Sequence, residues 1–87
     1  MKDELNILRE KIDSLDDKIL LLIEERIKIT EKIGAAKKKL DIPIRDANRE
    51  KEKIEALKAK ASKLNIPEIL IEKIWDAFFT ISEKVQK

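Results

Sequence analysis

Apolar residues recur along residues 3–40 in steps that alternate between three and four. They are Leu5, Leu8, Ile12, Leu15, Ile19, Leu22, Ile29, Ile33, Ala36 and Leu40. This spacing is the a and d seam of a heptad repeat, so it predicts one long helix with an apolar stripe. The one interruption lies between Leu22 and Ile29, where the stripe carries Arg26. An arginine on a buried line costs free energy unless an anion meets it, so Arg26 indicates a buried anion site.

The predicted helix is too long for a compact chain of 87 residues. At about 1.5 Å per residue it would span roughly 55 Å. A compact monomer of this length would be only roughly 30 Å across. The remaining residues are too few to cover the stripe. The pattern therefore predicts an intertwined homodimer, in which a second copy covers the apolar stripe.

Two shorter helices are expected after the long one, each following a connection marked by proline. Pro43 lies in the first connection, and Asp46 is placed to cap a helix that runs to about Leu64. Pro67 is suited to the first turn of the last helix. The predicted fold class is all-α, with one very long N-terminal helix and two shorter helices. Residues 1–87 would form a single domain.

A glutamate interrupts the apolar line of the second predicted helix. The other positions of that line are Ala47, Ile54, Leu57, Ala61 and Leu64. The interrupting residue, Glu50, lies in the first turn, where the helix dipole alone favours an acid. However, the chain also carries Arg26 on an apolar line. We therefore favour a functional interpretation of Glu50.

The last predicted helix has two lines of residues. The first is apolar throughout and is expected to be core: Ile71, Ile74, Phe78, Ile81 and Val85. The second begins with aromatic residues and ends with neutral hydrogen-bonding groups: Trp75, Phe79, Ser82 and Gln86. Its polar end belongs either to a fraying C-terminus or to an apolar wall that continues into a polar pocket.

Two positions near the end of the long helix each admit two interpretations. Lys37 is one of three closing lysines that suit the helix dipole, but it lies three turns after Arg26 and faces the same way as Arg26 and Ile33. Gly34 costs about 1 kcal/mol inside a helix relative to alanine. It is either tolerated, with a slight bend, or it marks the close approach of a ligand or a neighbouring helix.

Composition excludes several classes of chemistry. The chain has no Cys, His or Tyr, so a zinc site or a nucleophile paired with a histidine base is not expected. The net charge is only +2 with the two signs interleaved, which argues against a nucleic-acid partner. No apolar run approaches the length of a membrane span, and no signal-peptide core follows Met1. We expect no metal, cofactor, nucleic-acid or membrane partner, and a cytoplasmic protein.

The polar groups on or beside the apolar lines predict the chemistry of a ligand. They are Arg26, Lys37, Glu50, Ser82 and Gln86, with Asp46 and Arg49 at the start of the second helix. Two or more cations around a shielded volume indicate a small anion, and arginine grips carboxylates with two hydrogen bonds. The Glu50 carboxylate indicates a ligand hydroxyl that donates a hydrogen bond to it. Such a pocket either only binds its ligand or catalyses a reaction driven by conformation and electrostatics.

In this order, the residues resemble the all-helical class of chorismate mutases. The matching segments are Leu8-Arg9-Glu10-Lys11-Ile12-Asp13, Leu15-Asp16, Leu22-Ile23-Glu24-Glu25-Arg26, Ile33-Gly34-Ala35-Ala36-Lys37, Pro43-Ile44-Arg45-Asp46, Arg49-Glu50, Ser82 and Gln86. The resemblance covers the whole chain and implies one chorismate mutase domain in a dimer of interlocked chains with two equivalent active sites. The implied reaction is the Claisen rearrangement of chorismate, a dianion, to prephenate in phenylalanine and tyrosine biosynthesis. It needs no cofactor.

The resemblance also implies which residues would act on the substrate. Arg26 would hold the side-chain carboxylate, and Arg9 would reach in from the other subunit to grip a carboxylate. Ser82 would assist at the ring carboxylate. Lys37 and Gln86 would donate to the ether oxygen, where negative charge develops as the C–O bond breaks.

The remaining residues of the resemblance would shape and support the pocket. Glu50 would accept from the ring hydroxyl, helped by the backbone amide of Asp46. Arg49 would brace the charge network. Ile33 and Phe79 would form apolar walls. Phe79 stands where relatives usually carry an aliphatic residue, which would narrow the pocket.

Three other functions compete with this interpretation. An isochorismate–pyruvate lyase resembles the same fold and uses a similar cationic pocket, and only an assay with each substrate separates the two. A non-catalytic helical dimer predicts that Arg26→Ala stabilises or barely changes the fold and that no chorismate is consumed. A nucleic-acid adaptor predicts salt-sensitive binding.

Overall fold

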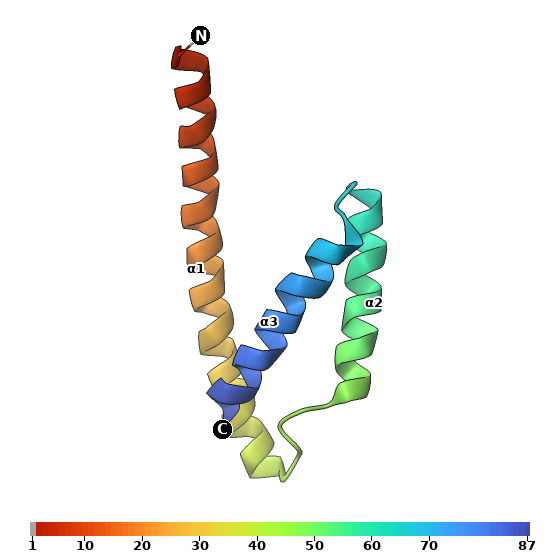
Figure 1. Ribbon diagram of the computed structural model, residues 1–87. Helices are drawn as coiled ribbons and strands as arrows, with labels where there is room; N and C mark the ends of the chain where they lie inside the picture. Colours follow the sequence, from red (N-terminus) through yellow and green to blue (C-terminus); the bar gives the residue numbers. More distant parts are fainter. Residues whose placement is uncertain (1) are drawn as a thin grey trace.

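The computed structural model describes residues 2–87, and within them the chain forms three helices and no strand. Helix α1 spans Lys2–Leu40, α2 spans Ala47–Lys63 and α3 spans Glu68–Gln86 (Figure 1). This confirms the predicted all-α fold with one long and two shorter helices. None of the helices is both long and apolar enough to cross a bilayer in the part of the chain that is described.

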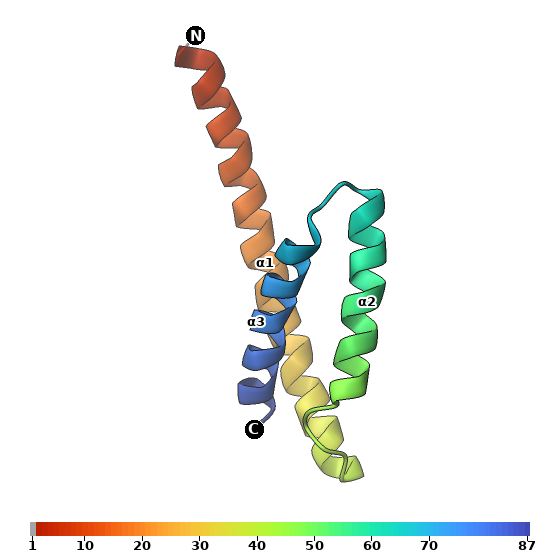
Figure 2. The same ribbon diagram turned by 45° about the vertical axis from the view of Figure 1, so that its right-hand side comes forward.

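Helix α1 makes the molecule elongated. The chain extends 59 × 25 × 16 Å, and its radius of gyration is 16.8 Å, whereas a compact chain of this length would have about 12 Å. Only the C-terminal half of α1 packs against α3. The N-terminal half extends beyond the other two helices in both views (Figures 1 and 2).

Local sequence explains where α2 and α3 begin and end. The side chain of Asp46 caps α2 and accepts a hydrogen bond from the backbone N–H of Arg49 at 3.1 Å. After α2, Asn65 adopts a left-handed conformation with φ of 58°, which asparagine tolerates better than most residues. Pro67 lies just before α3 rather than in its first turn, because its ψ of 136° is extended. That detail of the sequence prediction is wrong by one position.

Helix α3 lies between α1 and α2 and packs against both (Figure 1). Ala61 of α2 and Ile71 of α3 are the buried hydrophobic side chains of residues 3–87. Lys58 and Glu72 form an ion pair across the same helix pair. The rings of Trp75 and Phe78 stack edge to face with centroids 5.5 Å apart. The core is therefore small and lies along α3.

The apolar stripe of α1 is uncovered in the single chain. About half of the surface of each stripe residue in the N-terminal half is exposed, from 49% at Leu5 to 57% at Ile12. Leu15 and Ile19 continue the exposed line toward the middle of the helix. An uncovered apolar line of this length is costly in water, so the predicted homodimer would be its natural cover.

Candidate functional site

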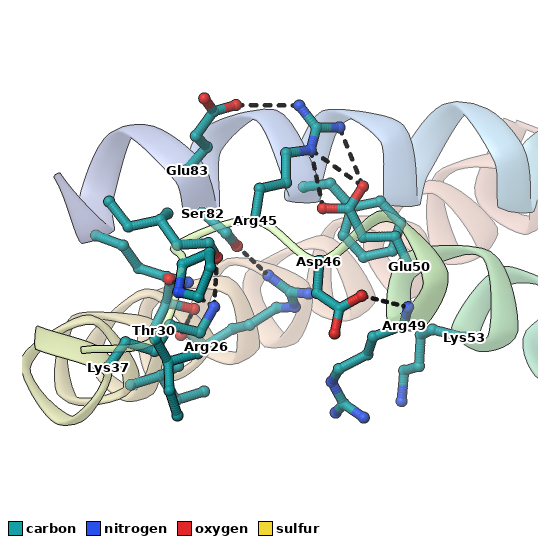
Figure 3. A pocket seen from close by; sticks show the side chains of 16 residues that line it. Arg26, Thr30, Lys37, Arg45, Asp46, Arg49, Glu50, Lys53, Ser82 and Glu83 are labelled. Atoms are coloured by element: carbon teal, nitrogen blue, oxygen red, sulfur yellow. Dashed lines mark hydrogen bonds and ion pairs between the residues drawn. The ribbon is translucent and has the colours of Figure 1, made fainter. Parts of the chain in front are cut away.

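A cavity of about 340 Å³ lies between the C-terminal half of α1, the connector of residues 41–46, the start of α2 and the last turns of α3 (Figure 3). All three helices and the connector contribute side chains to it. The lining residues are Arg26, Thr30, Ile33, Lys37, Ile42, Pro43, Ile44, Arg45, Asp46, Arg49, Glu50, Lys53, Phe79, Ser82, Glu83 and Gln86. Its size suits a small-molecule ligand.

The structure brings together all the residues proposed from the sequence for a site, with one exception. The residues that line the cavity are Arg26, Ile33, Lys37, Asp46, Arg49, Glu50, Phe79, Ser82 and Gln86. The exception is Arg9, which lies exposed on the N-terminal half of α1 and does not line the cavity of its own chain. Helical spacing therefore placed Arg26, Ile33 and Lys37 correctly on one face.

Arg26 is held by neighbours on α3. Its Nη1 donates to the Ser82 hydroxyl at 3.2 Å, and its guanidinium carbon lies 4.4 Å from the centre of the Phe78 ring. A cation over an aromatic face is attracted by the ring quadrupole. Partial burial lowers the pKa of Arg26 from its usual value because it removes solvent from the charged group. Arginine still stays charged at any ordinary pH, so the site keeps a fixed cation.

Lys37 joins α1 to the end of α3 and to the connector. Its ammonium donates to Gln86 Oε1 at 2.9 Å and to the backbone carbonyl of Ile44. An ammonium has only donors, so the Gln86 amide must turn its oxygen toward Lys37. The Gln86 NH₂ group is then left to donate elsewhere. Two hydrogen-bond donors, one charged and one neutral, stand side by side in the cavity.

Arg45 bridges two carboxylates from different helices (Figure 3). Its Nε and Nη2 donate to both oxygens of Glu50 on α2 at 3.0–3.1 Å, and its Nη1 donates to Glu83 on α3 at 3.0 Å. The hydrogen bond from Arg45 and the charge of Lys87 lower the pKa of Glu83. Glu50 Oε1 accepts from both Nε and Nη2, whereas Oε2 accepts from Nε alone, so Oε2 keeps capacity for a further hydrogen bond.

The charges around the cavity favour an anionic ligand. Five cationic and three acidic side chains line it, a surplus of two positive charges. The cations are Arg26, Lys37, Arg45, Arg49 and Lys53, and the acids are Asp46, Glu50 and Glu83. A doubly negative molecule would neutralise this surplus. Residues 2–87 contain no group of three or more acidic, histidine or cysteine side chains arranged to hold a metal ion.

Several lining residues were not proposed from the sequence. They are Thr30, Ile42, Pro43, Ile44, Arg45, Lys53 and Glu83. Thr30 follows Arg26 by one helical turn, and its hydroxyl donates to the Arg26 carbonyl at 2.8 Å, so helical spacing is a signal that could have found it. Arg45 lies in a connector without periodicity. Arg45 belongs to a segment that carries the family resemblance, Pro43-Ile44-Arg45-Asp46, but no role was assigned to it. Glu83 lies beside the two lines of α3 rather than on either, so no sequence signal marks it.

The sequence matches one family of known proteins over nearly its whole length. The profile of the chorismate mutase type II family matches residues 8–87. A chorismate mutase from Methanocaldococcus jannaschii is 33% identical over 87 residues, which are all of this chain and 88% of that protein. No solved structure matches the chain.

Two longer relatives match over a small part of their length. A bifunctional chorismate mutase/prephenate dehydratase from Aquifex aeolicus is 42% identical over 55 residues, 63% of this chain and 15% of that protein. The T-protein of Enterobacter agglomerans is 32% identical over 74 residues, 85% of this chain and 20% of that protein. The region that this chain shares with them is thus one small segment of a larger protein in each case.

Proposed function

The chain belongs to the chorismate mutase type II family, and on that premise we propose that the cavity described above is its active site. The enzyme is an isomerase that rearranges chorismate to prephenate in aromatic amino acid biosynthesis. The observation that carries the site assignment is the meeting of Arg26, Lys37 and Gln86 in one cavity with surplus positive charge.

The charges and hydrogen-bonding groups of the substrate agree with those of this cavity. Chorismate carries two carboxylates and a ring hydroxyl, and the cavity has a surplus of two positive charges. Arg26 is oriented by Ser82 and Phe78 before any ligand enters, so little freedom is lost when it grips a carboxylate. Glu50 is oriented by Arg45, and its Oε2 retains a lone pair for the ring hydroxyl.

The rearrangement needs no proton transfer, so it suits a site without a nucleophile or a titrating base. One C–O bond breaks while one C–C bond forms within a single molecule, and negative charge develops on the ether oxygen. Lys37 and the NH₂ group of Gln86 stand together and would both donate to that oxygen. Donors fixed in place before the reaction stabilise developing charge without reorganisation. Holding the compact conformer of the substrate supplies the remaining rate enhancement.

We also propose that the active enzyme is a homodimer in which Arg9 of the partner subunit completes each site. The accessible surface of the single chain is 7547 Å², whereas a compact monomer of this mass exposes about 5,300 Å². The excess of roughly 2,200 Å² per chain is of the size buried by obligate homodimers. The exposed apolar stripe of α1 is part of this surface, and the exposed position of Arg9 suits a role in a second chain.

The decisive experiment is to offer the purified protein chorismate and, separately, isochorismate. We expect loss of the diene absorbance of chorismate and prephenate as the product, with isochorismate left unchanged. Release of pyruvate from isochorismate would instead favour a lyase. A folded protein that consumes neither substrate would contradict the proposed function.

A matched pair of variants assigns the activity to the cavity. Arg26→Ala removes the cation that lies against Ser82 and Phe78, and we expect it to lower kcat/KM by at least about 100-fold. Lys28→Ala removes an exposed cation of the same helix, paired with Glu24 at 3.7 Å, and should leave activity unchanged. Equal activity of the two variants would place the reaction elsewhere.

The cytoplasmic location and the absence of a nucleic-acid partner stay predictions.

A further inference from the structure

Gly34 is buried on α1 directly against the backbone of Gln86. A Cβ atom added at Gly34 would lie 2.9 Å from the Cα of Gln86 and 3.0 Å from its Cβ and Cγ. Ordinary contact between such carbons begins at 3.4 Å. Any other residue at this position would therefore push the end of α3 away from α1. Of the two interpretations of Gly34, the structure supports the close approach of a neighbouring helix.

The backbone conformation of Gly34 is not what requires a glycine. Its φ is not positive, and it lies within a regular helix that alanine would favour. Only the missing side chain matters here. The requirement is thus one of space, and the three atoms nearest to the added Cβ all belong to Gln86.

We propose that Gly34 is a positioning residue that sets the Gln86 amide beside Lys37 for the rearrangement. Gly34 and Lys37 lie one turn apart on the same face of α1. The backbone of Gln86 rests on Gly34, and its Oε1 reaches Lys37 at 2.9 Å. The catalytic part of this inference rests on the proposed function, since Gln86 is assigned its role there.

The place of Gln86 in α3 makes this contact important. Gln86 is the last residue of the helix, and only the bond from the Lys87 N–H to the Glu83 carbonyl, at 3.3 Å, closes the turn after it. Helix ends fray unless something holds them. Contact with Gly34 and the bond to Lys37 hold the last turn of α3 onto α1. Forcing the two backbones apart at Gly34 would move the Gln86 amide relative to Lys37.

The test is a double-mutant cycle on Gly34→Ala and Gln86→Ala. A displacement of several tenths of an ångström weakens the Lys37–Gln86 bond and misplaces the donor. Small misplacements of catalytic groups are costly, so we expect Gly34→Ala to lower kcat by about 10- to 100-fold with a smaller change in KM. In the Gln86→Ala background the same substitution should lower kcat by less than about 2-fold, because the displaced group is already gone.

Two outcomes of the cycle would overturn the proposal. One is an equal loss in both backgrounds, which would mean that Gly34 acts independently of Gln86. The other is unchanged kcat in Gly34→Ala. A Gly34→Ala variant that does not fold would also overturn it, because the proposed effect is confined to the last turn of α3. Ala35→Gly, at an exposed neighbouring position outside the cavity, is the control and should keep its activity.

A second measurement does not depend on catalysis. In NMR spectra, the side-chain amide resonances of Gln86 should shift in Gly34→Ala and stay unchanged in Ala35→Gly. If the wild-type protein were inactive on chorismate, the proposed function would fail while this measurement still tested the positioning. An active wild type whose Gln86 resonances are unaffected by Gly34→Ala would contradict the positioning alone.

Discussion

Arg26, Lys37 and Glu50 each meet the cavity with their direction already set by another side chain. Phe78 and Ser82 hold Arg26, Gln86 and the Ile44 carbonyl hold Lys37, and Arg45 holds Glu50. Fixing these directions in advance is what electrostatic catalysis requires. The partners belong to α3 and to the connector. These two segments therefore orient the charged groups that α1 and α2 carry.

The pH dependence of turnover is a prediction at this scale. Gln86 does not titrate, and Arg26 stays charged even though burial lowers its pKa. We therefore expect kcat/KM to stay nearly constant from mildly acidic to mildly alkaline pH. Initial rates in a series of buffers at constant ionic strength would measure it. A steep loss between mildly acidic and neutral pH would show that a titrating group acts in the rate-limiting step.

Periodicity found the site residues that interrupt an apolar line or share its face, but it missed Thr30, which lies one turn after Arg26. Arg26 and Glu50 stood out because each interrupts an apolar line, and Lys37 because it shares a face with Arg26. Arg45 follows a proline in a connector, where no repeat fixes the direction of a side chain. Its hold on two carboxylates became visible only in three dimensions.

At the scale of elements, the connector of residues 41–46 does more than reverse the chain. Arg45 ties the start of α2 to the end of α3 through Glu50 and Glu83, and Lys37 of α1 reaches the Ile44 carbonyl. The connector therefore links all three helices around the cavity. The helices themselves were predictable because their apolar repeats are regular and prolines mark the breaks. The contacts that join them were not, since they depend on how α3 crosses α1.

The Arg45–Glu83 ion pair predicts how stability depends on pH. Arg45 lowers the pKa of Glu83 in the folded protein, so this pair stabilises the fold above the ordinary pKa of a glutamate, and its contribution is lost as the pH falls through the lowered value. Wild type should therefore lose more stability between pH 6 and pH 3 than Glu83→Gln does. Urea unfolding at each pH would measure the difference.

A control separates this ion pair from the general effect of acid. Glu10→Gln changes a carboxyl on the far half of α1, where the connector does not reach. It should lose stability between the two pH values as wild type does. Equal losses in wild type and Glu83→Gln would mean that the Arg45–Glu83 pair adds nothing to the fold.

The whole molecule is an open arrangement with a long uncovered helix. Its length was predictable from the repeat, and so was the need for a cover, because the remaining chain is too short to supply one. What periodicity could not give is the angle at which a second chain crosses. In the proposed homodimer, that angle would decide which pocket each Arg9 reaches.

Subunit exchange tests the proposed sharing of sites. Arg9→Ala and Gln86→Ala should each be nearly inactive alone. After mixing in equal amounts, half of the dimers combine the two variants, and each mixed dimer has one intact site, so about a quarter of wild-type activity should return. Activity of the mixture is the measurement, with exchange proven by mass-tagged subunits. No recovery after exchange would mean that Arg9 serves its own chain.

The small core has a consequence for how the protein persists at low abundance. Only Ala61 and Ile71 are buried hydrophobic side chains in residues 3–87, which is too little to hold a chain of this size against its conformational entropy. In the proposed homodimer, folding would therefore be coupled to the association of two chains. Dilution would then favour the unfolded chain, so the concentration of the protein would set the fraction that is folded.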